Sequence, residues 1–148
     1  MKKIVFVCHG NICRSPLAEF VFKHIVKQNG KDKEIEIISR ATSLEEIGND
    51  LYPPIKRVLQ KHSIPFSRHY ATRLVPGDYD KYDLFLCMDY NNMRNIRYIF
   101  NDDKNKKIHL IGEFVGDNKE VYDPWYSGDY DGVYAQLEKY LNTLIDLI

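Results

Sequence analysis

A cysteine and an arginine lie six residues apart near the start of this chain. Cys8 follows a short apolar run, and Arg14 comes after the stretch His9-Gly10-Asn11-Ile12-Cys13. A loop of this length between a strand and a helix can curl so that its backbone N–H groups converge on an anion. The planar guanidinium of Arg14 would complete the ring and bind two oxygens of a phosphate. The pattern therefore predicts a phosphate-binding loop.

The same loop suggests a nucleophile. Donors that surround the sulfur of Cys8 would stabilise it as a thiolate, which is placed to attack phosphorus and form a covalent phosphocysteine. Gly10 and Asn11 suit the turn, because both residue types tolerate left-handed backbone angles. Ser15 has two possible roles: capping the following helix, which is the simpler, or hydrogen bonding to the sulfur. Spacing alone is weak evidence, since Cys8 would also fit a buried strand.

Apolar patterns predict the elements that would position this loop. Short branched runs indicate strands at residues 4–7, 35–38, 84–88 and 107–111. Apolar stripes indicate helices that begin at Pro16 and Pro53, a helix over 93–100 and a closing helix over 133–148. Alternating strands and helices predict an α/β fold: a single doubly wound domain over residues 1–148, with a mainly four-stranded parallel sheet and helices on both faces. The phosphate loop follows the first strand, at the sheet edge where such folds bind ligands.

Composition restricts the class of protein. The 148 residues suit one domain, and lysine plus arginine equals aspartate plus glutamate at 21 each. No overall field then draws the chain to nucleic acid or an anionic membrane. Three cysteines are a poor disulfide framework and favour a reduced, cytoplasmic protein. We expect a monomer that needs no metal or cofactor.

The segment CHGNICRSP, followed by Leu-Ala-Glu, resembles the signature loop of the low-molecular-weight protein tyrosine phosphatases. The resemblance extends over nearly the whole chain, through similar segments at 39–43, 51–54, 69–71, 82–84, 88–89 and 123–126. It implies hydrolysis of phosphotyrosine in proteins or peptides, and of small aryl phosphates, through a phosphocysteine. Cys8 would be the nucleophile, Arg14 the phosphate clamp and Asp123 the general acid and base. Inorganic phosphate and vanadate are the expected inhibitors.

The resemblance also implies roles for the surrounding residues. Trp125 and Tyr126 would wall a slot for the aromatic ring, although core packing is their simpler role. Ser39 and His69 would support the loop with hydrogen bonds. The substrate would be bound by the loop and the slot, through His9, Gly10, Asn11, Ile12, Cys13, Ser15, Trp125 and Tyr126.

Other matches and departures complete the comparison with the family. Asp89 and Asn92 match the family too and are interpreted as structural residues outside the site. A Cys8–Cys13 disulfide that protects the nucleophile from oxidation is a further hypothesis. Leu44-Glu45-Glu46 stands where many relatives carry a tryptophan, so an acidic rim is expected in place of one aromatic wall. His9 replaces the leucine of some relatives.

Four other functions fit parts of the pattern. Arsenate reductases of the same fold need further cysteines in a mobile loop, whereas Cys87 lies in an apolar strand, where an inert thiol is expected. Arginine phosphatases of the family carry threonine at the position of Ile12. A module that binds phosphotyrosine without cleaving it, or a phosphocarrier subunit, would not require Arg14 and Asp123 beside Cys8.

Overall fold

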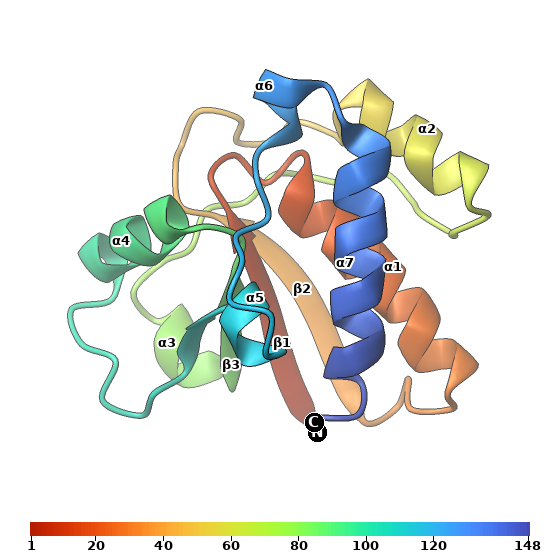
Figure 1. Ribbon diagram of the computed structural model, residues 1–148. Coiled ribbons are helices and arrows are strands. Elements are labelled where there is room, and N and C mark those ends of the chain that lie inside the picture. The colour runs from red at the N-terminus through yellow and green to blue at the C-terminus, as the bar shows by residue number, and fades with distance from the viewer.

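The computed structural model describes residues 1–148 and is built around one parallel sheet (Figure 1). Its strand order is β2-β1-β3-β4, with bounds β1 (Lys2–Cys8), β2 (Ile35–Ala41), β3 (Leu84–Cys87) and β4 (Ile108–Leu110). β1 lies in register with β2 from Lys2 opposite Ile35 to Cys8 opposite Ala41. The chain goes from β1 to β2 and then crosses to β3 on the other side of β1. The strand order therefore reverses beside Cys8, as the doubly wound prediction requires.

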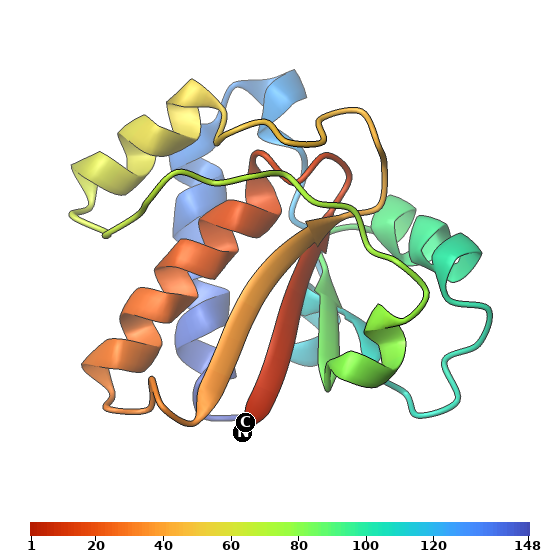
Figure 2. The ribbon, with the colours of Figure 1, turned by 180° about the vertical axis from the view of Figure 1, so that it is seen from behind.

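Helices cover both faces of this sheet (Figures 1 and 2). One face is covered by α1 (Arg14–Gln28), α2 (Pro53–Lys61) and α7 (Tyr130–Leu144), and the other by α3 (Asp78–Lys81) and α4 (Tyr90–Ile99). Alternate residues of β1 belong to different cores: Ile4 and Phe6 to the larger one, Val5 and Val7 to the smaller. All four side chains are fully buried, which is why the run is apolar without alternation.

Of the long helices, α2 starts at Pro53 as predicted. α4 and α7 start earlier than their apolar stripes indicate, at Tyr90 and Tyr130, because Asp89 caps α4 in a capping box and Asp129 caps α7. The first helix differs from the prediction. α1 starts at Arg14 with Cys13 as the N-cap residue and no side-chain cap, so Ser15 lies inside the first turn and the expectation that it caps the helix is wrong.

Other differences lie at element ends and in short elements. The fourth strand stops at Leu110, because Ile111 starts the four-residue helix α5 (Ile111–Phe114). The last helix ends at Leu144. The short helices α3, α5 and α6 (Pro124–Ser127) were not predicted, since four residues carry too little apolar periodicity to reveal a helix. No helix in the structure is long and apolar enough to cross a membrane.

Candidate active site

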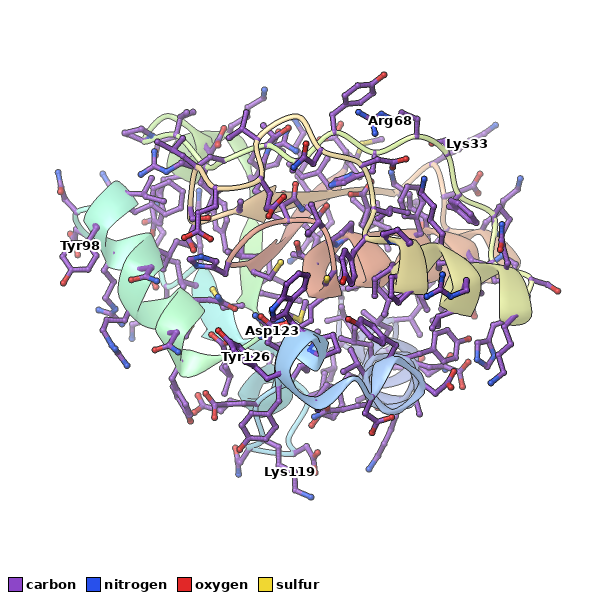
Figure 3. The ribbon with its side chains drawn as sticks, turned by 90° about the horizontal axis from the view of Figure 1, so that it is seen from above. Lys33, Arg68, Tyr98, Lys119, Asp123 and Tyr126 are labelled. Atoms are coloured by element: carbon purple, nitrogen blue, oxygen red, sulfur yellow. The ribbon has the colours of Figure 1, made fainter.

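A pocket of about 370 Å³ opens at the carboxyl end of β1. Its walls come from the β1–α1 loop, the segment after β2 and α6. Figure 1 shows these three segments at the same end of the sheet. Figure 3, which looks down on this end of the sheet, shows Asp123 and Tyr126 on the α6 turn. The lining residues are Cys8, His9, Gly10, Asn11, Ile12, Cys13, Arg14, Glu45, Glu46, Asp123, Trp125 and Tyr126.

The sulfur of Cys8 lies at the base of this pocket. Its residue is only 2% exposed, and its Sγ accepts a hydrogen bond from the Asn11 backbone N–H at 3.3 Å. The hydroxyl of Ser15 lies 2.9 Å from the same sulfur. α1 begins at this loop without a side-chain cap, so the positive end of its dipole is directed at the pocket. The loop therefore brings two hydrogen-bonding groups and a helix start to one sulfur.

Arg14 is held by groups from two distant segments. Its guanidinium is buried, and Nη1 donates to Asp89 Oδ2 at 2.6 Å and to the Val121 carbonyl at 2.8 Å. Nη2 lies 3.7 Å from Asp123 Oδ2. Burial alone would lower the pKa of Arg14, but the negative charges of Cys8 and Asp89 outweigh it and raise the pKa. The arginine therefore brings a permanent, fixed positive charge to the pocket.

Asp89 was missed as part of the site. It was predicted to be a structural residue outside the site, yet its carboxylate orients Arg14 and also caps α4 by accepting from the Asn92 backbone N–H at 2.8 Å. One signal was available. Asp89 follows β3 almost directly, and β3 is parallel to β1, so both strands end at the same edge of the sheet.

Asp123 comes from the α6 wall of the pocket. It is the N-cap of α6, where Oδ1 accepts from the Trp125 backbone N–H at 3.0 Å, which leaves Oδ2 on the side of Arg14. Trp125 is 57% exposed and Tyr126 is 88% exposed, so neither packs in a core. Both residues line the pocket, and the centroid of the Tyr52 ring lies 4.9 Å from that of Trp125. An aromatic ligand would find aromatic walls here.

Asn11 is the centre of the loop's support. It is fully buried, and its φ of 61° is left-handed, whereas Gly10 has no such angle. Its side-chain amide donates to Ser15 Oγ and to Ser39 Oγ, both at 2.9 Å. Its carbonyl accepts from His69 Nε2 at 2.7 Å. Its side-chain oxygen accepts from the Thr72 backbone N–H at 3.0 Å. These four partners fix an otherwise unfavourable backbone conformation around Cys8.

Burial shifts the pKa values of three other groups: His69, Cys13 and Cys87. Burial lowers the pKa of His69, which favours the neutral ring. Burial, followed by the nearby charge of Cys8, raises the pKa of Cys13 to about 12, and complete burial also raises the pKa of Cys87. Cys13 lines the pocket while Cys87 lies within β3, and all three cysteines are free.

Three ionisable side chains form the rim. Glu45 Oε2 lies 3.0 Å from His9 Nε2, and both side chains are largely exposed. Glu46 is half-buried and accepts from the Asn49 side-chain amide at 2.6 Å. The acidic rim expected from the sequence is present.

Comparisons with known proteins identify the family. The model for "Low molecular weight phosphotyrosine protein phosphatase" matches residues 3–148. The protein of that name from Homo sapiens is 38% identical over 143 residues, which covers 91% of this chain and 88% of that protein. Among solved structures, YfkJ from Bacillus subtilis has a TM-score of 0.95 at 28% identity, and covers 100% of this chain and 94% of its own.

A second solved structure matches the same fold over the whole chain. SP-PTP, the low molecular weight protein tyrosine phosphatase from Streptococcus pyogenes, has a TM-score of 0.89 at 33% identity and covers 100% of this chain and 93% of its own. The matches span the complete sheet, the β1–α1 loop and the α6 wall. This chain therefore belongs to the low molecular weight phosphotyrosine protein phosphatases.

Proposed function

We propose that this protein tyrosine phosphatase uses Cys8 as nucleophile, Arg14 as phosphate clamp and Asp123 as general acid and base. The observation that carries the proposal is the Cys8 sulfur, buried at the pocket base with the Asn11 N–H and the Ser15 hydroxyl directed at it. Few structural roles need a buried sulfur surrounded by donors at a helix start. Charge stabilisation before attack is the chemical role that fits.

In the first step the Cys8 thiolate attacks phosphorus and the bond to the aryl oxygen breaks. The guanidinium of Arg14 and the loop amides bind the equatorial oxygens, where charge is spread in the transition state. Protonated Asp123 gives its proton to the departing phenolate, whose conjugate acid has a pKa of about 10. The products are a neutral phenol and phosphocysteine.

In the second step water attacks the phosphocysteine. The Asp123 carboxylate takes a proton from this water, the S–P bond breaks, and Cys8 leaves as a thiolate with inorganic phosphate as the other product. The Ser15 hydroxyl, 2.9 Å from the sulfur, stabilises this leaving thiolate. Phosphate and vanadate bind the same loop and inhibit.

The experiment is to trap the intermediate. Rapid acid quench of the enzyme with an aryl phosphate, followed by peptide mass spectrometry, should locate phosphate on Cys8. Arg14→Lys should lower kcat/KM at least a hundredfold, because an ammonium cannot match two phosphate oxygens in a plane. Cys87→Ala, which alters a thiol buried in β3, should still form the intermediate. Full turnover by Cys8→Ser would overturn the proposal.

The alternative of arsenate reduction has less support. It needs cysteines that relay a disulfide, and Cys87 is fully buried among β3 and its neighbours. Arsenate with a thiol reductant should therefore give no steady turnover. A module that only binds phosphotyrosine would have no use for Asp123 directed at Arg14.

We further propose phosphotyrosine proteins or peptides as substrates, a monomeric state and a cytoplasmic location. The aromatic residues of the pocket, Trp125 and Tyr126, support a protein-borne phosphotyrosine, since they offer surfaces for its phenyl ring. Three free cysteines support a reducing compartment. The proposed Cys8–Cys13 disulfide would form there only under oxidative stress. Peroxide treatment and mass spectrometry test it, and persistent Cys8 sulfinic acid would contradict it.

A further inference from the structure

The carboxylates at the pocket rim take no part in the proposed catalytic steps. Glu45 and Glu46 line the same pocket as Cys8, yet both lie on the segment after β2, whereas Asp123 is the N-cap of α6. No lysine or arginine pairs with either of them in the structure, and the one ionic neighbour is His9 beside Glu45. The charge of Arg14 is already opposed by Asp89 and Asp123. The rim is therefore acidic.

Such a rim opposes the binding of a bare phosphate. A dianion that enters this pocket passes carboxylates at the entrance, and like charges there cost free energy unless a cation lies between them. A substrate that carries a basic side chain next to its phosphotyrosine would bring that cation. The rim carboxylates then attract this substrate through its cation and no longer repel it.

The rim carboxylates are held in place. A Cβ placed on Gly10 would lie 3.3 Å from Glu46 Cγ, so the stem of Glu46 packs directly on the phosphate loop. The Asn49 amide orients the Glu46 carboxylate, and His9 orients that of Glu45.

The segment that carries these residues is also anchored. The Thr42 N–H donates to the Cys8 carbonyl at 3.0 Å and the Ser43 N–H to the His9 carbonyl at 3.1 Å. The Gly48 N–H donates to the Ala71 carbonyl at 2.8 Å. The backbone of this segment is therefore already ordered before a ligand binds, so binding costs little further conformational entropy.

We propose that Glu45 and Glu46 form a subsite for a lysine or arginine side chain that flanks the phosphotyrosine of the substrate. This assignment rests on the phosphotyrosine activity proposed above and names the class of peptide that activity prefers. The exposed Leu44 and Ile47 on the same segment provide apolar surface for the stem of such a side chain.

The test uses three phosphotyrosine peptides of one sequence, with arginine, alanine or glutamate at the two positions that flank the phosphotyrosine. The intact enzyme should show kcat/KM about five- to tenfold higher for the arginine peptide than for the alanine peptide at low salt. The glutamate peptide should be the poorest, and 0.5 M salt should reduce the differences.

The variant Glu45→Gln/Glu46→Gln should lose this preference. Glu34→Gln is the matched control, because Glu34 is exposed and precedes β2 at the opposite end of the sheet. An arginine preference that persists in the double variant, or none in the intact enzyme, would overturn the subsite. If the intact enzyme did not hydrolyse 4-nitrophenyl phosphate, the proposed function itself would be overturned.

Discussion

In the proposed mechanism, the contacts of the Cys8 sulfur determine how readily it leaves phosphorus. Ser15 lies in the first turn of α1 with its hydroxyl 2.9 Å from Cys8 Sγ, and the Asn11 amide donates to the same hydroxyl. That second bond orients the Ser15 hydroxyl hydrogen toward sulfur. A hydrogen bond to a charged group contributes about 1.5–3 kcal/mol, so its loss should slow the departure of the thiolate about ten- to a hundredfold.

Ser15→Ala should therefore slow the second step more than the first. Stopped-flow kinetics with 4-nitrophenyl phosphate should show a burst of nitrophenol followed by slow turnover, with phosphocysteine accumulating. Ser127→Ala, which removes an exposed hydroxyl on α6, serves as the control. A uniform loss without a burst would show that Ser15 acts before the intermediate forms.

In the proposed mechanism the Asp123 carboxyl group supplies a proton to the leaving oxygen, so its importance depends on that oxygen. Asp123→Asn should lower kcat/KM, which reports only the steps up to phenol release, about 10²- to 10³-fold for phenyl phosphate, whose leaving group is poor. The loss should be much smaller for 4-nitrophenyl phosphate, whose nitrophenolate departs without protonation. A plot of log kcat/KM against leaving-group pKa should steepen in the variant, and parallel plots for the two enzymes would contradict the role.

At the scale of elements, α4 is tied to the site through its first residue. Asp89 caps α4 with one oxygen and binds Arg14 with the other. Asn is nearly as good a cap as Asp but cannot accept from Arg14 through its amide nitrogen. Asp89→Asn should therefore leave a buried guanidinium without its charged partner, at a cost of about 3 kcal/mol in unfolding free energy.

Urea unfolding measures this cost, and kcat/KM for aryl phosphates should fall at least tenfold. The matched control is Asp129→Asn. Asp129 caps α7 in the same way, through the Gly132 N–H, but has no arginine partner. Equal stability losses in the two variants would show that capping, and not the Arg14 ion pair, is what Asp89 contributes.

The short helix α6 depends on a contact with the start of α2. Tyr52, just before α2, places its ring 4.9 Å from that of Trp125, and such aromatic pairs contribute about 0.5–1.5 kcal/mol. Tyr52→Ala should loosen the loop that carries Asp123. We expect kcat for phenyl phosphate to fall about three- to tenfold, whereas Tyr52→Phe, which keeps the ring, should stay within about twofold. Equal rates in both variants would show that the position of α6 does not depend on the Tyr52 ring.

The long elements could be predicted from sequence because their signals are local. The apolar run of β1, Pro53 at α2 and the stripe of α7 each lie within one segment. The phosphate loop is likewise contiguous, from Cys8 to Arg14. Asp123 was assigned only through the family resemblance, and Asp89 was left outside. Their places depend on β3 and α6 meeting β1 in space, which spacing along the chain does not encode.

For the whole molecule, one end of the sheet combines segments that are far apart in sequence. The site draws on β1, the segments after β2 and β3, and α6, with the residue 69–73 segment behind them. His69 connects this last segment to the loop through the Asn11 carbonyl. Folding therefore buries an imidazole in a place where only its neutral form is favoured, and the stability of the molecule becomes linked to pH.

The sign of this linkage follows from the burial of His69, which lowers its pKa in the folded state. In the unfolded chain the ring titrates near its ordinary pKa of about 6.5. The stabilising contribution is then complete above that pH. It is lost as pH falls below it, toward the folded pKa, because the unfolded chain binds the proton more readily. Unfolding free energy should fall between pH 7.5 and pH 5.

Urea unfolding at pH 7.5, 6 and 5 separates His69 from other acid-labile groups. His69→Gln, whose amide can still donate to the Asn11 carbonyl, should be less stable at pH 7.5 but lose less stability on acidification. His24→Gln alters a half-buried histidine on α1 that makes no hydrogen bond in the structure, and should keep the original slope. If His69→Gln kept that slope as well, the acid sensitivity in this pH range would not come from His69. Asp50 acts outside this range: burial alone would raise its pKa, but hydrogen bonds from four groups outweigh burial and lower the pKa, so its contribution is lost only below about pH 4.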